Sequence, residues 1–482
     1  MKKKFIINLA LLIFINLLIK PFWFFGIEVS VQNRVGTENY GFYFSLFSFA
    51  FILNILLDAG INNYNNRTIA RNHHLAESHL SRIIPLKFAL AGIYALVVFT
   101  LGWIIGYSPD QFRLLWILVI NQFLSSLILY FRTNISGLQY FTTDSLLSVL
   151  DRTLMILFTG LLLWGNVTSK PFRIEWFVYC QTVSYTITLI ITLIILLSKT
   201  GKIKLLFNFG EGLKILKKSY PYALLILLMS LFNRIDSVML ERLLNDGQEQ
   251  AGIYAQSFRI LDATSQFALL FSVLLLPMFA RMLKLKQEVN SLVNISVSLL
   301  MVAALTLAVT SNFYRGEFMS LLYHQSGPFT SKIFGLLMID FIFISLSYIY
   351  GTLLTANGSL KALNILAGIT VVINISLNLI LIPRYKAIGA AWASVISQGF
   401  YATGQIFLSI RVIDLKMKYD LLFRLFLLTM LLIVLNVVGL THINNWIPAS
   451  LLSLAAGLVL AFVLRLIRIK EMVNILKEDS QS

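Results

Sequence analysis

Apolar runs of about 20 residues recur along the whole chain, separated by short polar stretches. A helix of this length can cross a bilayer. The runs are continuous and do not alternate between apolar and polar positions, so they favour membrane helices over a membrane β-barrel. We predict about fourteen such spans. They lie near residues 5–26, 40–61, 83–107, 112–131, 145–165, 174–198, 220–241, 254–280, 289–311, 332–356, 359–382, 387–412, 420–440 and 446–468.

The composition agrees with this pattern. The chain of 482 residues is 58% hydrophobic and 13% charged, and its mean hydropathy is +0.80. A soluble domain carries about 25% charged residues, and a soluble fold of this length has too little interior to hide so much apolar surface. We therefore predict an all-α polytopic membrane protein.

The first apolar run, MKKKFIINLALLIFINLL, resembles a signal peptide. No small-residue cleavage site follows it, and the apolar run continues past Phe22, so we interpret it as a retained first helix. The single cysteine, Cys180, lies inside a predicted span, which argues against a disulfide framework.

The net charge of +17 is distributed as expected for a membrane protein. If the Lys2–Lys4 end is placed inside, most Lys and Arg fall on the inner side, and the even number of spans places both termini in the cytoplasm. Nucleic acid is not a predicted partner. The most basic segment, KTGKIKLLFNFGEGLKILKK at 199–218, is interpreted as a topology signal that touches anionic lipid. A regulatory partner site is the alternative.

That basic segment also divides the chain, with six spans before it and eight after it. Gly41-Phe42-Tyr43 and Gly252-Ile253-Tyr254 follow polar loops at matching places and suggest an internal repeat. Because six is even, both lobes would insert with the same orientation, as in parallel-repeat transporters. We predict an N-terminal six-helix lobe (1–198), a basic cytoplasmic linker (199–219), a C-terminal six-helix lobe (220–412), and two additional helices with a cytoplasmic tail (413–482).

The segment LMSLFNRIDSVMLERLL, residues 228–244, carries charge inside a predicted span. At 100° per residue, Arg234, Asp236 and Glu241 share one half of the helix with Asn233, and the opposite half is apolar. The polar half should face protein or water, and Arg242 should reach the outer interface. Other spans repeat this design. The further polar candidates are Asn16 and Lys20, Asn54 and Asp58, Gln256, Arg259, Asp262 and Gln266, and the lone acid Asp340.

Each charge at mid-membrane costs roughly 2.5–3.5 kcal/mol on insertion. Two interpretations explain why such residues are retained, and both can hold together. In one, ion pairs lock helices to each other; Asp151 and Arg152 fit this role, paired with other helices because adjacent side chains diverge by about 100°. In the other, the residues line a hydrophilic central cavity. Lys20, Arg234 and Arg259 would then meet an anion, phosphate above all.

Other chemistry finds little support. His73, His74 and His79 lie in an inner loop without a metal-ligand pattern. The sequence holds no P-loop, dinucleotide-binding turn or nucleophile elbow. We therefore predict no metal, no cofactor and no ATP-driven transport by this chain alone. Asp340 remains open between a structural role and a proton or cation site.

Three segments together resemble a known family. These are Asp58-Ala59-Gly60-Ile61 at the end of the second span, NRIDSVML with AGIYAQSFRILD in spans seven and eight, and NISLNLILIPRYKAIGAAWASVISQ with Asn378, Ile382-Pro383 and Gly389-Ala390-Ala391. They resemble the polysaccharide transporter family, the O-antigen and capsule repeat-unit flippases. That family belongs to the superfamily of multidrug, oligosaccharidyl-lipid and polysaccharide exporters. The Gly-Ala-Ala stretch has a simple physical role, since small residues let helices approach closely.

The resemblance implies a V-shaped pair of lobes whose cavity is walled by spans one, two, seven and eight. It implies a non-enzymatic flippase that moves an undecaprenyl-pyrophosphate-linked oligosaccharide across the bacterial cytoplasmic (inner) membrane by alternating access. Lys20, Arg234 and Arg259 would contact the diphosphate. Membrane lipids, a polysaccharide polymerase and a chain-length regulator are the implied partners. Coupling to H⁺ or Na⁺ is open, with Asp58, Asp262 and Asp340 as titratable candidates.

Three rival functions stay open. A cation-coupled multidrug exporter of the same superfamily would suit an acidic cavity better than one with arginine on both walls. A membrane polysaccharide polymerase or ligase usually carries a large outer catalytic loop, whereas the loops predicted here are short. A peptidoglycan precursor flippase is the third.

Overall fold

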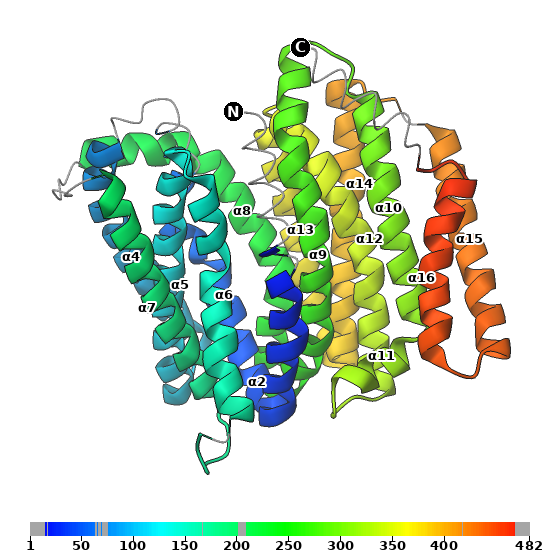
Figure 1. The fold of residues 1–482 in the computed structure, drawn as a ribbon, viewed down its shortest axis with the longest axis horizontal. Helices are drawn as coiled ribbons and strands as arrows, with labels where there is room; N and C mark the ends of the chain where they lie inside the picture. Colours follow the sequence, from blue (N-terminus) through cyan, green and yellow to red (C-terminus); the bar gives the residue numbers. More distant parts are fainter. Residues whose placement is uncertain are drawn as a thin grey trace. The chain divides into compact units, whose positions relative to one another are not determined.

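A computed structural model describes residues 15–16, 18–62, 65, 69, 76–165, 167–200, 209–416 and 418–467. Across these residues the fold is entirely helical, with fourteen α-helices, two short helices of other types and no strand (Figure 1). Eleven of the helices are long and apolar enough to cross a membrane. The predicted class, an all-α polytopic membrane protein, is confirmed. Most of the first predicted span, the histidines His73 and His74, and the end of the C-terminal tail lie outside the described residues.

By their contacts the residues form two compact units, Met1–Ala255 and Gln256–Ser482. The division falls inside one long helix, α9 (Gly247–Lys284). The sequence instead suggested a boundary at the basic linker 199–219, with 220–412 as the second lobe. That assignment of lobes, and the pseudo-symmetry between them, stays a prediction.

The first unit is built mainly around α2, which packs against α5 and α8, while α5 also packs against α7. The start of α5 shows why these helices begin where they do, because Ser108 and Gln111 form a capping box and Pro109 opens the first turn. Its elements are η1 (Phe22–Glu28), α2 (Val29–Ile52), η2 (Asn54–Leu57), α4 (Ala76–Ile105), α5 (Pro109–Gly137), α6 (Phe141–Trp164), α7 (Ile174–Thr200) and α8 (Phe209–Leu243).

In the second unit α12 packs against α10 and α14, α13 packs against α14, and α15 and α16 both pack against α10. Gly389 at the start of α14 fits the predicted packing role, since a Cβ there would lie 2.3 Å from the carbonyl oxygen of Leu381. The elements after α9 are α10 (Asn290–Phe313), α11 (Arg315–Leu322), α12 (Pro328–Ala356), α13 (Leu360–Tyr385), α14 (Ala387–Ile413), α15 (Tyr419–His442) and α16 (Trp446–Val463).

The polar stretch between the first two predicted spans corrects their expected ends at 26 and 40. It is helical on both sides of a single break at Gly36, whose φ of 82° and ψ of 166° interrupt α2. Some of the polar residues there are buried within the first unit, whereas Arg34, Glu38 and Asn39 are exposed. Glu28 and Gln32 are 5% and 2% exposed. The sequence analysis places Glu28 and Gln32 in a loop between spans because polar side chains favour water. In the structure both side chains contact protein instead.

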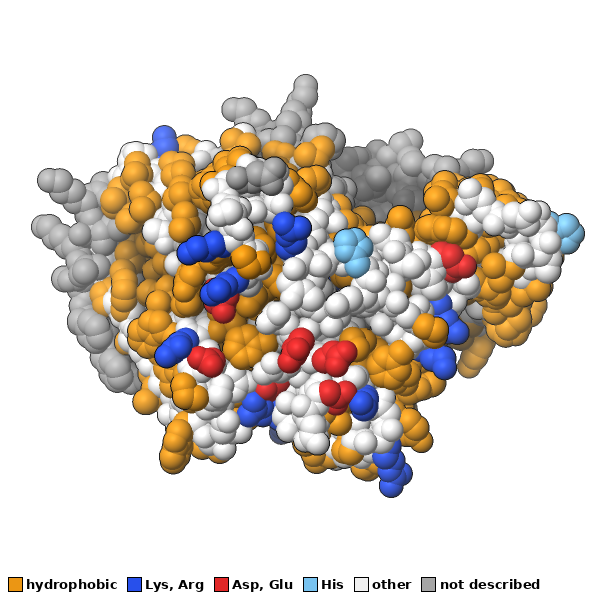
Figure 2. Space-filling model, turned by 90° about the horizontal axis from the view of Figure 1, so that it is seen from below, with side chains coloured by type: hydrophobic (Ala, Val, Ile, Leu, Met, Phe, Trp, Pro, Cys, Tyr) orange, Lys and Arg blue, Asp and Glu red, His pale blue; other side chains and the backbone are white. Residues whose placement is uncertain are grey.

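The flanks of the helices are apolar. Large hydrophobic side chains are exposed along the helices of both units, among them Trp103, Trp116, Val372, Phe423 and Phe462. Figure 2 looks along the helices from below and shows Lys, Arg, Asp and Glu side chains on that face, with many hydrophobic side chains toward its rim. This distribution is the one expected for helices whose sides contact lipid.

Candidate functional site

The second predicted span does not continue as one helix to residue 61. It ends as an α-helix at Ile52 and narrows to the 3₁₀-helix η2. It then turns through Ala59 and Gly60, whose φ values are 45° and 84°. A Cβ on Gly60 would lie 2.7 Å from the Cβ of Ser219, so both the backbone angle and the close approach require glycine. This turn frees backbone carbonyls inside the first unit.

Lys87 on α4 binds the end of this broken helix. Its Nζ donates to Oδ1 of Asp58 at 2.7 Å, to the carbonyl oxygen of Leu57 at 2.9 Å and to the hydroxyl of Ser126 at 3.3 Å. The Lys87 side chain is 1% exposed and that of Asp58 is 22% exposed. Asp58, chosen from the sequence as a polar cavity or coupling residue, is therefore one half of a buried ion pair.

Lys87 is a residue that the sequence interpretation missed. It stands alone in the apolar run IIPLKFALAG, and an ionisable residue inside a membrane helix is by default a functional or pairing candidate. That signal was available. The identity of its partner was not, because Asp58 and Lys87 are brought together only by the packing of α4 on the broken helix.

Helix α8 positions Arg234 against aromatic rings of α2. The guanidinium carbon lies 4.4 Å from the ring centroid of Phe51 and 5.9 Å from that of Phe47, within the range of cation–π attraction. The side chain is half-buried. An arginine held in this way keeps its charge in place, because the flat guanidinium stacks on the rings.

The two acids of α8 are satisfied by other helices of the first unit. Asp236 is fully buried and accepts a hydrogen bond from the hydroxyl of Tyr254 at 2.9 Å. Glu241 is 7% exposed and accepts one from Nε2 of Gln111, on α5, at 2.7 Å. The polar half of α8 thus meets protein, one of the two surroundings that its periodicity allowed. Asn233 beside them is half-buried.

Arg242, which is predicted to reach the outer interface, also makes several contacts within the first unit. It pairs with the neighbouring Glu241 and donates to Oε1 of Gln111 at 3.1 Å and to the carbonyl oxygen of Gly106 at 3.2 Å. Its guanidinium also lies 4.9 Å from the ring centroid of Tyr107. Arg242 therefore ties the last turn of α8 to the connection between α4 and α5, because its planar fork can serve several acceptors at once.

Helix α2 approaches the start of α9 through glycine. A Cβ on Gly41 would lie 1.8 Å from the carbonyl oxygen of Gln248, and one on Gly252 would lie 1.9 Å from that of Thr37. Gln32 donates to the carbonyl oxygen of Gly252 at 2.9 Å. The two Gly-x-Tyr segments that the sequence matched as a repeat therefore touch each other, and the matching residue type is required by backbone contact.

Near the start of the chain, Asn16 donates to the hydroxyl of Ser148 at 3.2 Å, and Lys20 is half-buried. Further charges lie on α5 and α6, where Arg132 pairs with Asp144 at 2.9 Å. Arg152 stacks on Trp23 with 5.3 Å between its guanidinium carbon and the ring centroid.

Arg152 contacts Trp23 of another segment, in line with the prediction that it pairs with other helices, but it also approaches its neighbour Asp151. Nε of Arg152 lies 3.7 Å from Oδ2 of Asp151. The direction of two Cα–Cβ bonds limits short side chains, but the long arginine stem can fold back.

Most of the remaining predicted residues belong to the second unit. In α9, Gln256 is 1% exposed and donates to the carbonyl oxygen of Gln325 at 3.2 Å, and Arg259 is 7% exposed. Asp262 and Gln266 are half-buried farther along the same helix, and Asn54, in the first unit, is half-buried at the start of η2. Two arginines of the predicted set, Arg234 and Arg259, thus occupy membrane helices of different units.

Asp340 on α12 is 1% exposed and accepts a hydrogen bond from the hydroxyl of Ser394, on α14, at 2.8 Å. Within the α13 segment that carries the family resemblance, Asn378 donates to Oδ1 of Asn374 at 3.1 Å, and both side chains are fully buried. Asn374 was not predicted. Its four-residue spacing from Asn378 inside an apolar helix is the signal that could have identified it.

The chemistry available to these residues is electrostatic. Within the described residues, no group of three or more His, Cys, Asp or Glu is placed to hold a metal ion. What the membrane helices hold instead is charge, carried by arginine, lysine and carboxylate side chains that other helices fix in position. Such residues mark the pathways of ions or substrates in membrane proteins.

Solved structures share this fold. The lipid II flippase MurJ in an inward closed conformation matches with a TM-score of 0.65 and 15% identity, over 96% of this chain and 99% of that one. A MOP superfamily transporter from Pyrococcus furiosus matches with a TM-score of 0.57 and 16% identity, over 86% and 96%. A multidrug resistance MATE family transporter in an outward-facing conformation matches with a TM-score of 0.57 and 15% identity, over 85% and 95%. No curated protein matches the sequence.

The fold and the buried charges define a multi-pass membrane protein with the architecture of MurJ and the MATE transporters. The sequence also matches the family described as polysaccharide biosynthesis protein over residues 5–283, more than half of the chain. The chain belongs to this family, and the resemblance seen in the sequence is confirmed.

Proposed function

We propose that this protein is a flippase that moves an undecaprenyl-pyrophosphate-linked oligosaccharide repeat unit, of an O-antigen, capsule or exopolysaccharide, from the cytoplasmic to the outer leaflet of the bacterial inner membrane. Transport proceeds by alternating access and forms no covalent bond. Both termini lie in the cytoplasm. The observation that carries the proposal is membership of the polysaccharide biosynthesis protein family by a chain built of membrane-spanning helices.

The coverage of the solved structures supports a lipid-linked substrate over a drug. MurJ, a lipid II flippase, corresponds to 96% of this chain, whereas the MATE transporter corresponds to 85%. The part of the chain without a counterpart in the MATE transporter is about the size of α15, α16 and the tail together. A chain with nearly complete correspondence to a lipid-linked saccharide flippase favours a substrate of that class.

The buried cations support an anionic substrate. Arg234 and Arg259 lie in membrane helices, and Lys20 is half-buried near the start of the chain. Arginine matches phosphate oxygens with two parallel donors, so it suits a diphosphate better than lysine alone would. In the proposed mechanism these three residues bind the diphosphate while sugar hydroxyls meet Asn, Gln and Ser side chains.

The membrane potential assists outward movement of a diphosphate. Each negative charge that leaves a negative interior releases about 2.3 kcal/mol per 100 mV. A coupling ion, H⁺ or Na⁺, would add to this driving force. The titratable candidates for such coupling are Asp58, Asp262 and Asp340, which lie in different predicted membrane spans.

The proposal is tested by deleting the gene in its host and analysing lipid extracts by mass spectrometry. We expect one undecaprenyl-pyrophosphate oligosaccharide to accumulate while surface polysaccharide disappears. If single repeat units still reach the surface but are not lengthened, the protein is a polymerase or acts with one. If neither lipid nor surface glycan changes and drug sensitivity rises, the multidrug exporter takes its place.

Complementation with variants tests the residues. The double variant Arg234→Ala with Arg259→Ala should insert in the membrane and fail to restore surface polysaccharide. A matched control is Arg113→Ala, because this arginine is 82% exposed and pairs only at the surface with Asp110. Full restoration by the double variant would remove the two arginines from the mechanism.

A further inference from the structure

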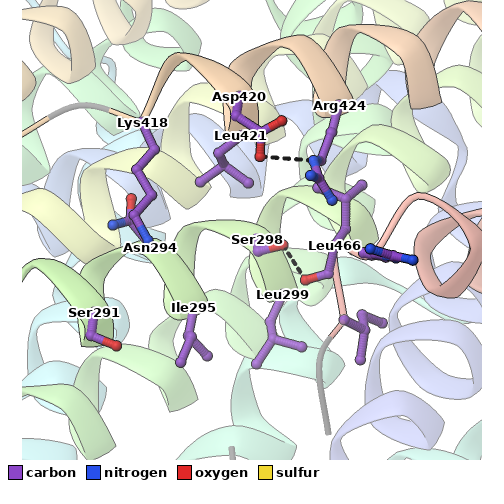
Figure 3. Close-up of a pocket in the computed structure, with 12 residues that line it drawn as sticks. Ser291, Asn294, Ile295, Ser298, Leu299, Lys418, Asp420, Leu421, Arg424 and Leu466 are labelled. Atoms are coloured by element: carbon purple, nitrogen blue, oxygen red, sulfur yellow. Dashed lines mark hydrogen bonds and ion pairs between the residues drawn. The ribbon is translucent and has the colours of Figure 1, made fainter. Parts of the chain in front are cut away.

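The second unit contains a pocket of about 100 Å³, and none of the candidate substrate or coupling residues lines it. It lies where the first turns of α10 and α15 meet the segment that follows α16 (Figure 3). A cavity needs roughly 10–15 Å³ to hold one water, so this pocket has room for several waters and for a group the size of a phosphate.

The pocket is positively charged. Lys418, Arg424 and Arg465 line it together with a single acid, Asp420. The acid is already engaged, because its Oδ2 lies 2.9 Å from Nε of Arg424. Ser291 and Asn294, on α10, add polar groups to the lining, and Asn294 lies beside Lys418 in Figure 3. Three cations against one acid give a local excess that suits an anion able to accept several hydrogen bonds.

The walls are fixed by hydrogen bonds that join separate segments. The hydroxyl of Ser298 donates to the carbonyl oxygen of Leu466 at 2.6 Å, and Nη1 of Arg424 donates to that of Leu464 at 2.9 Å. The amide of Lys416 donates to Oδ1 of Asn290 at 2.9 Å. Arg465 itself has a φ of 54°, a left-handed conformation that residues other than glycine seldom adopt. The pocket is therefore built in advance of any ligand.

The surroundings of the pocket identify the occupant as a lipid. Apolar side chains continue from it along α15, where Leu422, Phe423 and Phe426 are 43%, 64% and 58% exposed. Tyr419 at the start of the same helix is 81% exposed, as aromatic residues at a membrane interface are. Basic pockets between membrane helices on the cytoplasmic side bind anionic headgroups, and the predicted orientation places this end of α15 there.

We propose that the pocket formed by Lys418, Arg424 and Arg465 binds the phosphate headgroup of an anionic phospholipid, whose acyl chains lie along the exposed apolar surface of α15. This site is separate from the residues proposed for the transported substrate. A structural lipid held here secures the two C-terminal helices against α10.

Native mass spectrometry of the purified full chain tests the site, with phosphatidylglycerol and phosphatidylcholine as probes. Wild-type protein should bind phosphatidylglycerol in preference to phosphatidylcholine. The double variant Lys418→Gln with Arg465→Gln should bind phosphatidylglycerol about 25-fold more weakly, since each interfacial cation contributes about five-fold. Both side chains are exposed, so the change should leave the fold intact. The matched control is Lys361→Gln with Arg384→Gln, which removes an exposed lysine and an exposed arginine of α13.

A variant with the opposite effect guards against misfolding. Asp420→Asn removes the only acid among the lining residues and should tighten phosphatidylglycerol binding by about five-fold. An unfolded protein would not show a gain. Equal binding of the two lipids by wild-type protein, or equal loss in the control, overturns the proposal. Inorganic phosphate that binds as tightly as phosphatidylglycerol would assign the pocket to a soluble anion and also overturn it.

Discussion

The two units hold their helices together with different polar groups. In the first unit several of the links are charged: Lys87 with Asp58, Arg132 with Asp144, and Arg242 and Gln111 with Glu241. In the second unit, links between helices are mostly neutral. Ser272 bonds Thr352 at 2.6 Å, and Ser453 bonds both Thr310 and Asn436 at 2.7 and 2.8 Å.

The difference bears on how each unit responds to change. A buried charge that loses its partner carries the full cost of its desolvation, whereas a neutral hydrogen bond in a membrane is replaced more readily. We therefore expect the stability of the first unit to depend strongly on a few charged pairs. The stability of the second unit should depend on many weaker hydrogen bonds. A graded series of substitutions can test this comparison through the free energy of unfolding in mixed micelles.

The largest effect is expected for Asp58→Ala. The Lys87 side chain is 1% exposed and would be left as an uncompensated buried charge, so the substitution should cost about 3–5 kcal/mol. Denaturation by sodium dodecyl sulfate measures it. Lys87→Met should cost less, because Asp58 is 22% exposed and can still reach water. Adding Lys87→Met to Asp58→Ala should recover stability. An additive loss in the double variant would show that the pair is not coupled.

An intermediate effect is expected for Ser394→Ala in the second unit. Asp340 is 1% exposed and would lose the hydroxyl that donates to its Oδ2, at a cost of about 1–3 kcal/mol. The same denaturation assay measures it, and Ser394→Thr, which keeps a hydroxyl, serves as the control. If Ser394→Ala matched Asp58→Ala, the contrast between charged and neutral links would fail.

A smaller effect is expected for Ser453→Ala. This residue links α16 to both α10 and α15, but all of its partners are neutral. Interhelical hydrogen bonds of this kind contribute about 0.6 kcal/mol in membranes, and we expect a loss near that value for each of the two bonds. If Ser453→Ala lowered the free energy of unfolding by more than about 3 kcal/mol, this neutral link would be as important for stability as a buried charged pair.

The smallest effect is expected for Arg113→Gln. This arginine pairs with Asp110 at 3.2 Å, but the two side chains are 82% and 79% exposed. Exposed pairs contribute about 0.2–1 kcal/mol, so the variant should unfold within that range of the wild type. The result sharpens the comparison, because it separates the effect of charge from the effect of burial. A loss as large as that of Asp58→Ala would mean that charge alone decides.

Much of the fold could be predicted from the sequence. Apolar runs of bilayer length identify membrane helices because lipid imposes a fixed thickness and forbids unsatisfied backbone. The ends of the helices were harder. Glu28 and Gln32 looked like loop residues but are buried, and the second span breaks at 53–60. The polarity of a residue, taken from one sequence, does not show whether its side chain contacts water or other parts of the protein.

The candidate site was predictable in residue type and less so in arrangement. Periodicity selected Arg234, Asp236 and Glu241 because charge inside lipid is costly. Periodicity did not predict that Arg234 would lie over the ring of Phe51 or that Tyr254 would donate a hydrogen bond to Asp236. It also did not predict that Lys87 would pair with Asp58. Those partners come from helices far apart in the chain, and helical spacing determines only neighbours on the same helix.

By itself, then, the sequence determined the class of this protein, its membrane-spanning helices and the charged residues that such helices must accommodate. These features follow from the bilayer, whose thickness and apolar interior constrain each span independently of the others. Only the tertiary structure decided which charge meets which partner, why Gly41 and Gly252 must both be glycine, and that three basic residues around α15 enclose a pocket. Each of these depends on contacts between segments far apart in sequence, which exist only once the helices have packed.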